Sequence, residues 1–514
     1  MSKMKKLLSV ILAFTMVLAM SITAFAEGEK APATKYSYEA YQIFSGTVDE
    51  KGELTGIDWG TGVNSPALVA ALKADTTFEG AFANASSATD VAAILAGYGN
   101  DSPKMKAFAE VVAANLTTIK TTGDDKVTLP AAGYYLIKDA DGTVPDGESY
   151  TRYIIKTSSA AEITPQRKAD VPEMIKKVKE NTTTTVGKAT LRDYETPDDY
   201  NDVADYNIGD KVPFQIVGSL PSNYADYKTY YYQFSDSYNK SQLALDANSI
   251  KVTVNGTTPV TGFTLAETDG GFTLTCTDLK TAIPTLTADD VIVVDYEMTL
   301  LSGANVGAGN GNENEAKLIF SNNPNKGHDG EKGETPEDKV VVFTYTAPVE
   351  KIDGTTLAKL ENVEFVFQNA DNKYVTVDEN GKVTGWVDTK EAATVLKTKA
   401  DGTFAIVGLD DGTYKLIETK PLPGYNAIDP ITVVVDADTT NTQDWNGAQS
   451  SVSTKVDLKV NGTPVTGEKI VVENKSGATL PTTGGMGTTM FYLIGALCVV
   501  CAGVLLISKK RVAR

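Results

Sequence analysis

The feature that most constrains the fold is a series of short segments in which apolar and polar residues alternate. Strand side chains point to opposite faces with a period of two residues, so such segments form strands with one buried face. The first series comprises Met174–Val178, Lys211–Val217, Ser249–Val254, Gly271–Thr277, Val291–Leu300, Ala316–Phe320 and a strand near Lys339–Tyr345. The second comprises Val363–Gln368, Phe404–Val407, Tyr414–Glu418, Ile431–Val435 and Lys469–Glu473. Turn residues separate the segments, which is typical of β-sandwich domains.

The N-terminal part adds helical segments to this pattern. Strands are expected at Lys35–Phe44, Gly133–Ile137 and Tyr150–Lys156. Between them, residues 65–116 are rich in alanine with helical spacing, and Pro66 suits the first turn of a helix. The sequence therefore predicts an all-β chain of tandem immunoglobulin-like sandwich domains, of which the first carries a helical insertion.

The C-terminal segment contains three features in a fixed order. An apolar run extends from Met490 to Ile507, which is about the minimum length for a helix that crosses a bilayer. Before it stand Leu480, Pro481, Thr482, Thr483 and Gly484, and after it stand Lys509, Lys510, Arg511 and Arg514. A basic tail holds the end of such a helix on the cytoplasmic side. This order resembles the LPXTG cell-wall sorting signal of Gram-positive surface proteins, which is the substrate of a sortase.

The resemblance implies a defined processing step. A sortase cysteine attacks the carbonyl of Thr483 and releases the chain from Gly484 onward. The acyl group then passes to an amine, and membrane anchoring is transient.

The N-terminus agrees with export. Three lysines (Lys3, Lys5 and Lys6) precede an apolar stretch at Leu7–Met20, and small residues follow at Ala24-Phe25-Ala26. This arrangement is typical of a secretory signal peptide, so the mature chain is expected to begin at Glu27. Both terminal segments carry only basic charges, so the mature chain is more acidic than the formal net charge of −19.

Composition excludes several classes of function. The acidic surface disfavours nucleic acid as a partner. The only histidine is His328, in a loop of Gly, Asn and Pro, which argues against histidine-based metal sites and hydrolytic triads. Outside the C-terminal apolar run the one cysteine is Cys276, so no internal disulfide is expected to stabilise the exported chain. We expect no metal, no cofactor and no enzyme activity.

In the third domain, three polar residues are in phase with the apolar residues of their own strands. They are Lys351, Glu418 and Asn474. If the apolar neighbours face the core, these three side chains face it as well. A buried lysine tends to lose its proton and a buried carboxyl group tends to keep one. The neutral amine can then attack the asparagine carboxamide with the acid as proton shuttle, which yields a Lys–Asn isopeptide bond and ammonia.

The segment Asp411–Tyr425 looks like the E-box of CnaB-type domains in Gram-positive pilins. In that family a glutamate assists a bond between a lysine of the first strand and an asparagine of the last. The resemblance assigns these roles to Glu418, Lys351 and Asn474. The alternative is that Lys351 and Glu418 form a simple ion pair or lie at the surface.

The middle domain contains a similar set. Lys176, Asp210 and Asn314 are each in phase with apolar residues, and their surroundings resemble the CnaA-like domains of major pilins. There a lysine, an aspartate and an asparagine perform the same ligation. The neighbouring Lys177, which is in the opposite phase to Lys176, and Asn312, two residues before Asn314, are rivals, and a β-bulge would exchange the choice.

The first domain lacks such a set. Gly133–Asp139 looks like a degraded E-box without its glutamate. No convincing lysine, acid and asparagine triad accompanies it, so we expect this domain to be the least stable.

The predicted organisation has five parts. They are a signal peptide (1–26), an N-terminal β-domain with a helical insertion (27–168), a CnaA-like domain (169–345), a CnaB-like domain (346–477), and the sorting signal with its transmembrane helix and basic tail (478–514). The whole resembles the backbone subunit of a sortase-assembled pilus on the cell wall. The resemblance implies as partners a sortase, identical subunits, accessory pilins or peptidoglycan, and a role in adhesion to a host receptor that no motif identifies.

Polymerisation requires an acceptor lysine. In the family it lies near the end of the first domain, often in a Tyr-Pro-Lys motif, which is absent here. Pro165-Gln166-Arg167-Lys168 occupies the corresponding place, so Lys168 is the candidate, with Lys156 and Lys177 as rivals. The alternative function is a monomeric wall-anchored adhesin that binds a host protein or glycan; a wall-attached hydrolase is a more distant one.

Overall fold

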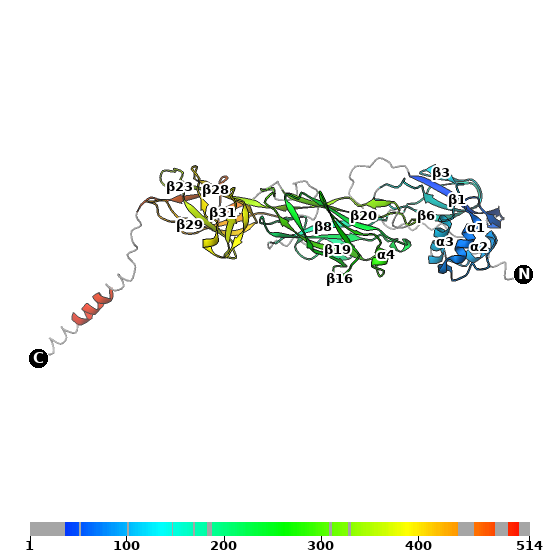
Figure 1. The fold of residues 1–514 in the computed structure, drawn as a ribbon, viewed down its shortest axis with the longest axis horizontal. Coiled ribbons are helices and arrows are strands. Elements are labelled where there is room, and N and C mark those ends of the chain that lie inside the picture. The colour runs from blue at the N-terminus through cyan, green and yellow to red at the C-terminus, as the bar shows by residue number, and fades with distance from the viewer. Residues whose placement is uncertain are drawn as a thin grey trace. The chain divides into compact units, whose positions relative to one another are not determined.

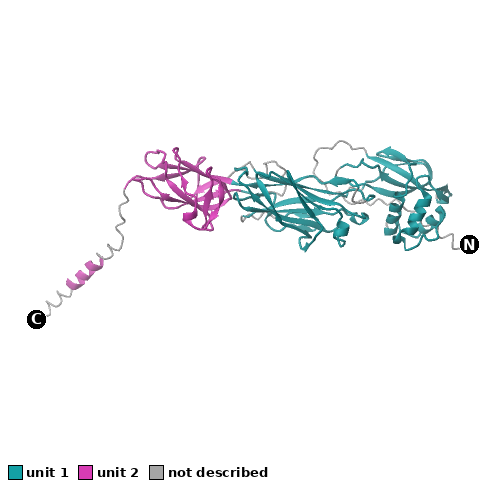
Figure 2. Ribbon diagram, viewed as in Figure 1, with its two compact units in different colours: residues 1–344, 438–455 teal, residues 345–437, 456–514 magenta. Residues whose placement is uncertain are grey.

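A computed structural model gives the architecture of the chain. It describes residues 36–50, 53–99, 102–145, 147–167, 170–181, 188–307, 311–326, 330–439, 457–477 and 492–502. The chain forms two compact units, residues 1–344 with 438–455 and residues 345–437 with 456–514 (Figure 2). The first unit contains the N-terminal and middle domains, and the second contains the third domain.

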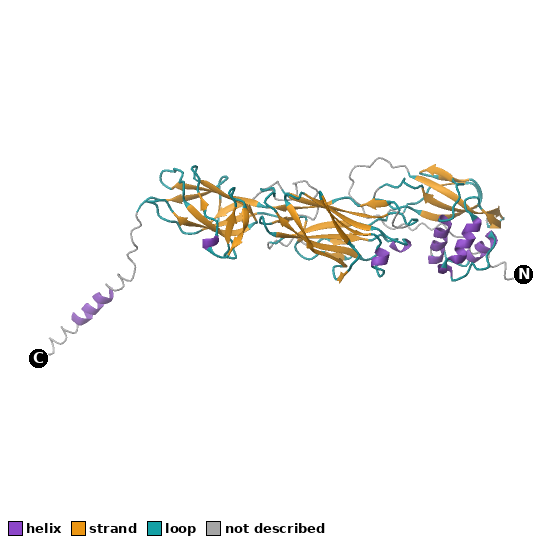
Figure 3. Cartoon of the chain, viewed as in Figure 1, coloured by secondary structure: helices purple, strands orange, loops and turns teal. Residues whose placement is uncertain are grey.

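The N-terminal domain is a β-sheet covered on one face by helices (Figure 3). Its main sheet has the order β2-β1-β5-β6, with β3 paired to β1, and β4 and β7 form a separate pair. The strands are β1 (Ser37–Val48), β2 (Leu54–Trp59), β3 (Thr121–Asp124), β4 (Val127–Leu129), β5 (Gly133–Asp139), β6 (Arg152–Thr157) and β7 (Ala161–Ile163). The helices are α1 (Ser65–Ala74), η2 (Thr76–Phe78), α2 (Ala88–Leu95) and α3 (Pro103–Ala113).

Local sequence explains where these helices begin. Ser87 and Asp90 form a reciprocal capping box at the start of α2. Ser102 caps α3, and Pro103 occupies its first turn, where a missing N–H costs nothing. The apolar helix faces then pack with Tyr41, Phe44 and other sheet residues in one core.

The middle domain is a sandwich of two sheets. The six-stranded sheet has the order β11-β8-β13-β19-β15-β16, and the seven-stranded sheet has the order β12-β22-β20-β14-β18-β17, with β21 paired to β20. Figure 1 labels β8, β16, β19 and β20 among these strands. Its longer strands are β8 (Met174–Lys179), β13 (Lys211–Ser219), β14 (Tyr232–Tyr238), β15 (Leu243–Val254), β17 (Thr264–Thr268), β18 (Gly271–Cys276), β19 (Val291–Leu300), β20 (Asn312–Ser321) and β22 (Asp338–Phe343). The short elements are β9 (Thr190–Leu191), β10 (Tyr194–Glu195), β11 (Tyr200–Asn201), β12 (Val203–Asp205), η3 (Tyr224–Asp226), β16 (Thr258–Pro259), α4 (Leu279–Ala282) and β21 (Lys332–Glu334).

The third domain is a second sandwich. A three-stranded sheet, β28-β23-β33, faces a larger sheet with the order β26-β25-β24-β29-β30-β31-β32, to which β27 adds by pairing with β24. The elements are β23 (Tyr345–Asp353), β24 (Glu364–Gln368), β25 (Tyr374–Val377), β26 (Val383–Val387), η4 (Lys390–Ala392), β27 (Leu396–Lys397), β28 (Thr403–Leu409), β29 (Gly412–Lys420), β30 (Ile431–Asp436), β31 (Asp457–Val460), β32 (Thr463–Pro464) and β33 (Ile470–Asn474).

The predicted fold class, tandem β-sandwich domains with a helical insertion in the first, is confirmed. The signal peptide, the pentapeptide Leu480–Gly484, Lys168 and His328 lie outside the described residues. Of the apolar run at 490–507, residues 492–502 are described and helical. Within the described part of the chain, no helix has both the length and the apolar character needed to span a bilayer.

Candidate functional site

In the third domain, the three predicted cross-linking residues meet between the two sheets. Lys351 lies on β23 and Asn474 on the neighbouring parallel strand β33, where Lys351 is opposite Val472 in the register. Glu418 comes from β29 of the facing sheet. Lys351 and Asn474 are completely buried, and Glu418 is only 8% exposed. The alternation along each strand thus points all three polar side chains into the core.

The asparagine amide is held at both ends. Lys351 Nζ donates a hydrogen bond to Asn474 Oδ1 at 2.5 Å, and Asn474 Nδ2 donates to Glu418 Oε1 at 2.9 Å. Lys351 Nζ lies 3.8 Å from Glu418 Oε1. The second carboxylate oxygen accepts a hydrogen bond from the backbone N–H of Ile428 at 2.9 Å, which fixes the orientation of the acid. The amine therefore lies beside the amide carbonyl, and the acid lies beside the amide nitrogen.

Burial also favours the neutral form of the lysine. Loss of hydration lowers the pKa of Lys351 to about 8, although the charge of Glu418 opposes that shift. About a tenth of such an amine is neutral at pH 7, whereas an ordinary lysine is almost entirely protonated. Only the neutral amine has the lone pair that attacks a carbonyl carbon.

The middle domain contains a second buried cluster, and it bridges the two sheets. Lys176 lies on β8 of the six-stranded sheet, and Asn314 lies on β20 of the seven-stranded sheet. Both are completely buried. Their acidic partner is Asp236 on β14, which is 2% exposed and forms an ion pair with Lys176. The two predicted cross-linking residues thus lie in one cluster with an aspartate.

Tyr296 on β19 connects the members of this cluster. Its hydroxyl accepts hydrogen bonds from Lys176 Nζ at 2.7 Å and from Asn314 Nδ2 at 3.3 Å. It donates to Asp236 Oδ2 at 2.6 Å. The rings of Tyr296 and Phe214 also lie against Lys176 Nζ, with centroid distances of 5.4 and 5.6 Å. A single hydroxyl therefore contacts the amine, the acid and the amide.

The electrostatics of this cluster favour an uncharged lysine and acid. Burial lowers the pKa of Lys176, against the opposing charge of Asp236. Burial likewise raises the pKa of Asp236, while Lys176, Tyr296 and Asn314 oppose the shift. In the described part of the chain, Asp236 Oδ1 and Asn314 Oδ1 have no hydrogen-bond partner. A proton on Asp236 would give the amide oxygen a donor when negative charge develops there.

The structure does not bring Asp210 into the cluster, so its predicted role as the assisting acid is corrected. Asp210 precedes β13, which begins at Lys211, and follows Gly209, whose φ is +95°. It therefore lies in a turn, where the alternation of strand side chains does not apply. There Asp210 Oδ2 accepts a hydrogen bond from Asn207 Nδ2 at 2.9 Å. Asp236 occupies the position that the sequence assigned to Asp210.

The sequence contains a signal for Asp236 that the prediction missed. The strands expected in the middle domain do not include Tyr232–Tyr238. Yet Tyr232, Phe234, Asp236 and Tyr238 alternate, and all four are buried on one face of β14. Asp236 is thus in phase with three aromatic residues, which is the same criterion that identified Lys176.

The rivals Lys177 and Asn312 are also buried, but they have different partners. Lys177 is 3% exposed and forms an ion pair with Asp202. Asn312 Nδ2 donates to the backbone oxygens of Val342 at 3.0 Å and Asn305 at 3.1 Å. Lys177 and Asn312 therefore belong to structural contacts outside the cluster.

The N-terminal domain has buried charges without an asparagine. Among its described residues, the buried polar ones are Glu39, Asp139, Ser149, Thr151 and Thr157. Glu39 pairs with Lys120 and with Lys138. Asp139 pairs with Arg167, the residue before the candidate acceptor Lys168.

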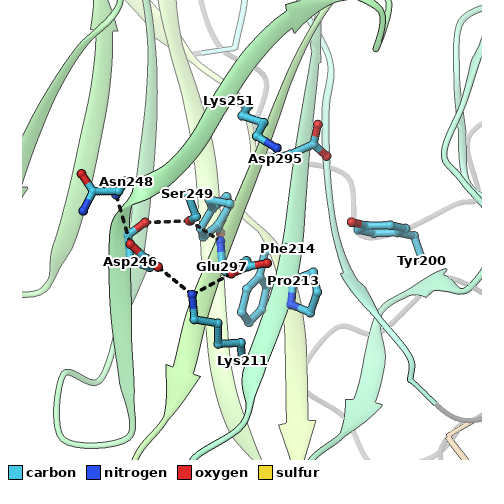
Figure 4. A pocket seen from close by; sticks show the side chains of 11 residues that line it. Tyr200, Lys211, Pro213, Phe214, Asp246, Asn248, Ser249, Lys251, Asp295 and Glu297 are labelled. Carbon is cyan, nitrogen blue, oxygen red and sulfur yellow. Dashed lines mark hydrogen bonds and ion pairs between the residues drawn. The ribbon is translucent and has the colours of Figure 1, made fainter.

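A pocket on the middle domain lies beside the bulge of β15 between Asp246 and Lys251 (Figure 4). Lys211 in this pocket forms ion pairs with Asp246 at 2.8 Å and Glu297 at 3.1 Å. The lining residues are Tyr200, Lys211, Pro213, Phe214, Asp246, Asn248, Ser249, Lys251, Asp295, Tyr296 and Glu297. Lys176, Asp236 and Asn314 are not among them.

Comparison with known proteins finds a family model that matches part of the third domain. Residues 346–449 match the family SpaA, described as a prealbumin-like fold domain. This range contains Lys351 and Glu418. None of the curated proteins matches the chain.

Solved structures similar to this chain include three backbone pilins. The pilus 2b backbone protein of group B streptococcus is 29% identical, with 54% of this chain and 97% of that chain covered and a TM-score of 0.39. The T6 backbone pilin of Streptococcus pyogenes serotype M6 is 15% identical, with coverages of 87% and 97% and a TM-score of 0.46. The major pilin SpaD of Corynebacterium diphtheriae is 14% identical, with coverages of 90% and 95% and a TM-score of 0.42.

Proposed function

We propose that this chain is the structural backbone subunit of a covalent surface pilus and that two internal Lys–Asn isopeptide bonds stabilise it. The observation that carries the proposal is the buried cluster of Lys351, Glu418 and Asn474 in a domain that matches the SpaA family. The bonds join Lys351 to Asn474 and Lys176 to Asn314. Glu418 and Asp236 act as the assisting acids.

The reaction is the same at both sites. The neutral lysine amine attacks the asparagine carboxamide carbon, the acid donates and accepts protons, and ammonia leaves. The fold supplies the effective concentration, because the reacting groups are already in contact before the bond forms. The reaction occurs once at each site and is a self-modification.

The location of the third-domain bond suits a protein under tension. It joins β23, the first strand of the domain, to β33, the last one. Pulling force that enters through one of these strands then passes to the other through covalent bonds and bypasses the sandwich. By analogy with disulfides, closure of a loop of this size contributes on the order of 5 kcal/mol to stability.

Polymerisation forms a second kind of covalent bond. Sortase cleaves after Thr483 within Leu480–Gly484 and transfers the threonine carbonyl to Lys168 of the next subunit. Arg167 supports this choice of acceptor, because its contacts with Asp139 and Glu148 anchor the chain directly before Lys168. Burial of the rival Lys177 in an ion pair argues against that residue. The assembled chain would lie on the cell wall and support adhesion.

The test is a sortase reaction with the exported chain. The wild type and Lys156→Ala should form a ladder of covalent oligomers on a denaturing gel, and Lys168→Ala and Thr483→Ala should not. A ladder that persists in Lys168→Ala but disappears in Lys156→Ala would identify Lys156 as the acceptor. Wall attachment without any ladder in the wild type would instead support the monomeric adhesin.

A further inference from the structure

Tyr296 brings a hydroxyl group to the middle-domain cluster that the three-residue scheme does not use. Its hydroxyl oxygen lies 2.7 Å from Lys176 Nζ and 3.3 Å from Asn314 Nδ2. These are the two nitrogens between which a proton must move when the isopeptide bond forms. The same oxygen lies 2.6 Å from Asp236 Oδ2.

We propose that Tyr296 is a further catalytic residue of the middle-domain ligation, in which its hydroxyl relays a proton from Lys176 Nζ to Asn314 Nδ2. This inference rests on the proposed self-ligation of that domain. It adds a fourth participant to the lysine, the acid and the asparagine.

Bond formation begins at the amine of Lys176. The Nζ lone pair attacks Asn314 Cγ, and the carbonyl electron pair moves to Oδ1, where a proton from Asp236 stabilises it. In this tetrahedral intermediate Nδ2 is an amine with a lone pair that can accept a proton. Tyr296 gives its proton to Nδ2 and receives one from Nζ. The Cγ–Nδ2 bond then breaks, ammonia leaves, Oδ1 returns its proton to Asp236, and both Asp236 and Tyr296 end in their initial state.

The surroundings hold the hydroxyl in place for this step. The Tyr296 ring stacks on Phe214 at a centroid distance of 5.5 Å and meets Phe272 edge-on at 5.3 Å. Both aromatic partners are themselves buried. Burial raises the pKa of Tyr296 far above its usual value, so the phenol keeps the proton that it must donate.

The third domain has a different arrangement around the leaving nitrogen. There the acid itself contacts the leaving nitrogen, with Glu418 Oε1 at 2.9 Å from Asn474 Nδ2. In the middle domain Asp236 Oδ2 is engaged by Lys176 Nζ and by the Tyr296 hydroxyl. The hydroxyl therefore provides a hydrogen-bonded path between the amine and the leaving nitrogen.

The test measures both bonds in one chain. Mature chain kept unfolded in urea is diluted into buffer, quenched at intervals and digested, and each cross-linked peptide pair is quantified by mass spectrometry. In Tyr296→Phe, which keeps the ring and removes the hydroxyl, the Lys176–Asn314 bond should form about a hundredfold more slowly. The Lys351–Asn474 bond should form at the wild-type rate and serves as the internal control.

Tyr238→Phe is the matched control variant. Tyr238 is buried on β14 directly opposite Asn314 in the register, and its hydroxyl faces the backbone of Leu245. Its loss should leave both rates unchanged. If Tyr238→Phe slows the middle-domain bond as much as Tyr296→Phe does, the effect belongs to packing and the relay is refuted.

A second variant separates proton transfer from folding. Site-specific 3,5-difluorotyrosine at position 296 keeps the hydroxyl but makes it more acidic, so the pH dependence of the middle-domain rate should shift relative to the wild type. An unshifted profile, or a wild-type rate in Tyr296→Phe, would overturn the relay while leaving the self-ligation intact. Absence of the middle-domain bond from the wild type would instead refute the self-ligation on which the relay rests.

Discussion

The middle and third domains bury the same three kinds of residue but arrange them differently. In the third domain the acid contacts the amide, with Glu418 Oε1 at 2.9 Å from Asn474 Nδ2 and at 3.8 Å from Lys351 Nζ. In the middle domain the acid forms an ion pair with the amine, and a tyrosine hydroxyl connects the pair to the amide.

The strands that carry the residues explain this difference. In the third domain the lysine and the asparagine lie on neighbouring parallel strands of one sheet, and the acid comes from the other sheet. In the middle domain the asparagine and the acid lie on the neighbouring strands β20 and β14, and the lysine comes from the other sheet. Which two residues share a sheet thus determines which pair is held by strand register and which by packing of the sandwich.

The largest expected effect is the loss of one bond without the other. Glu418→Ala should abolish the Lys351–Asn474 bond and Asp236→Ala the Lys176–Asn314 bond, because each removes the proton shuttle of its own domain. The mass deficit of each variant relative to its own sequence should shrink by about 17 Da, the mass of the retained ammonia. The affected domain should lose on the order of 5 kcal/mol in free energy of unfolding, measured by denaturant titration.

These two variants also test whether the domains react independently. If Glu418→Ala removes both bonds, ligation in one domain depends on the other, and the two sites do not react independently.

The second prediction concerns pH. Because the pKa of Lys351 is lowered to about 8, its neutral fraction should rise about fiftyfold between pH 6 and pH 8 and then level off. The rate of the Lys351–Asn474 reaction on refolding from urea should rise with it. Time-resolved mass spectrometry of the digested chain measures that rate. A rate that is flat across this range would show that deprotonation of Lys351 does not limit the reaction.

The third prediction contrasts two adjacent lysines. Lys177→Met should leave the total mass deficit unchanged, because Lys177 pairs with Asp202 and not with an asparagine. It should destabilise the middle domain by about 3 kcal/mol, because Asp202 loses its cationic partner while it stays buried. Lys176→Met should instead reduce the mass deficit relative to its own sequence by one ammonia, because the Lys176–Asn314 bond cannot form. The reverse result would mean that Lys177 is the reacting lysine.

The smallest expected effect separates the two aspartates. Asp210→Ala should keep both bonds and cost about 1 kcal/mol in the unfolding free energy, because it removes only the hydrogen bond with Asn207. Intact mass and a denaturant titration measure the two quantities. If the mass deficit relative to the variant's own sequence shrinks by one ammonia, Asp210 is the assisting acid and the role of Asp236 is refuted.

Much of the fold and of the third-domain cluster could be predicted from sequence, because both depend on local alternation. Lys351 and Glu418 lie inside regular strands and Asn474 is the last residue of one, so the face of each side chain follows from its neighbours. The acid of the middle-domain cluster was not found from alternation. Asp210 lies one residue before β13, and a shift of one residue at a strand end decides whether a side chain belongs to the strand at all.

Two residues of the middle-domain cluster could not be identified from the pattern of residues within a strand. Asp236 and Tyr296 each satisfy the alternation on their own strands, but so do other buried residues. Only the pairing of β14 with β20 and the packing of one sheet on the other bring them to Lys176 and Asn314. Such contacts between distant strands depend on sheet topology, which the spacing of residues within a strand does not encode.

The most direct test of the central claim is the intact mass of the mature chain, residues 27–483, under denaturing conditions. Two isopeptide bonds predict a mass about 34 Da below that of the sequence, the mass of two ammonia molecules. A mass equal to that of the sequence would contradict the account, and both buried clusters would then be unreacted polar networks.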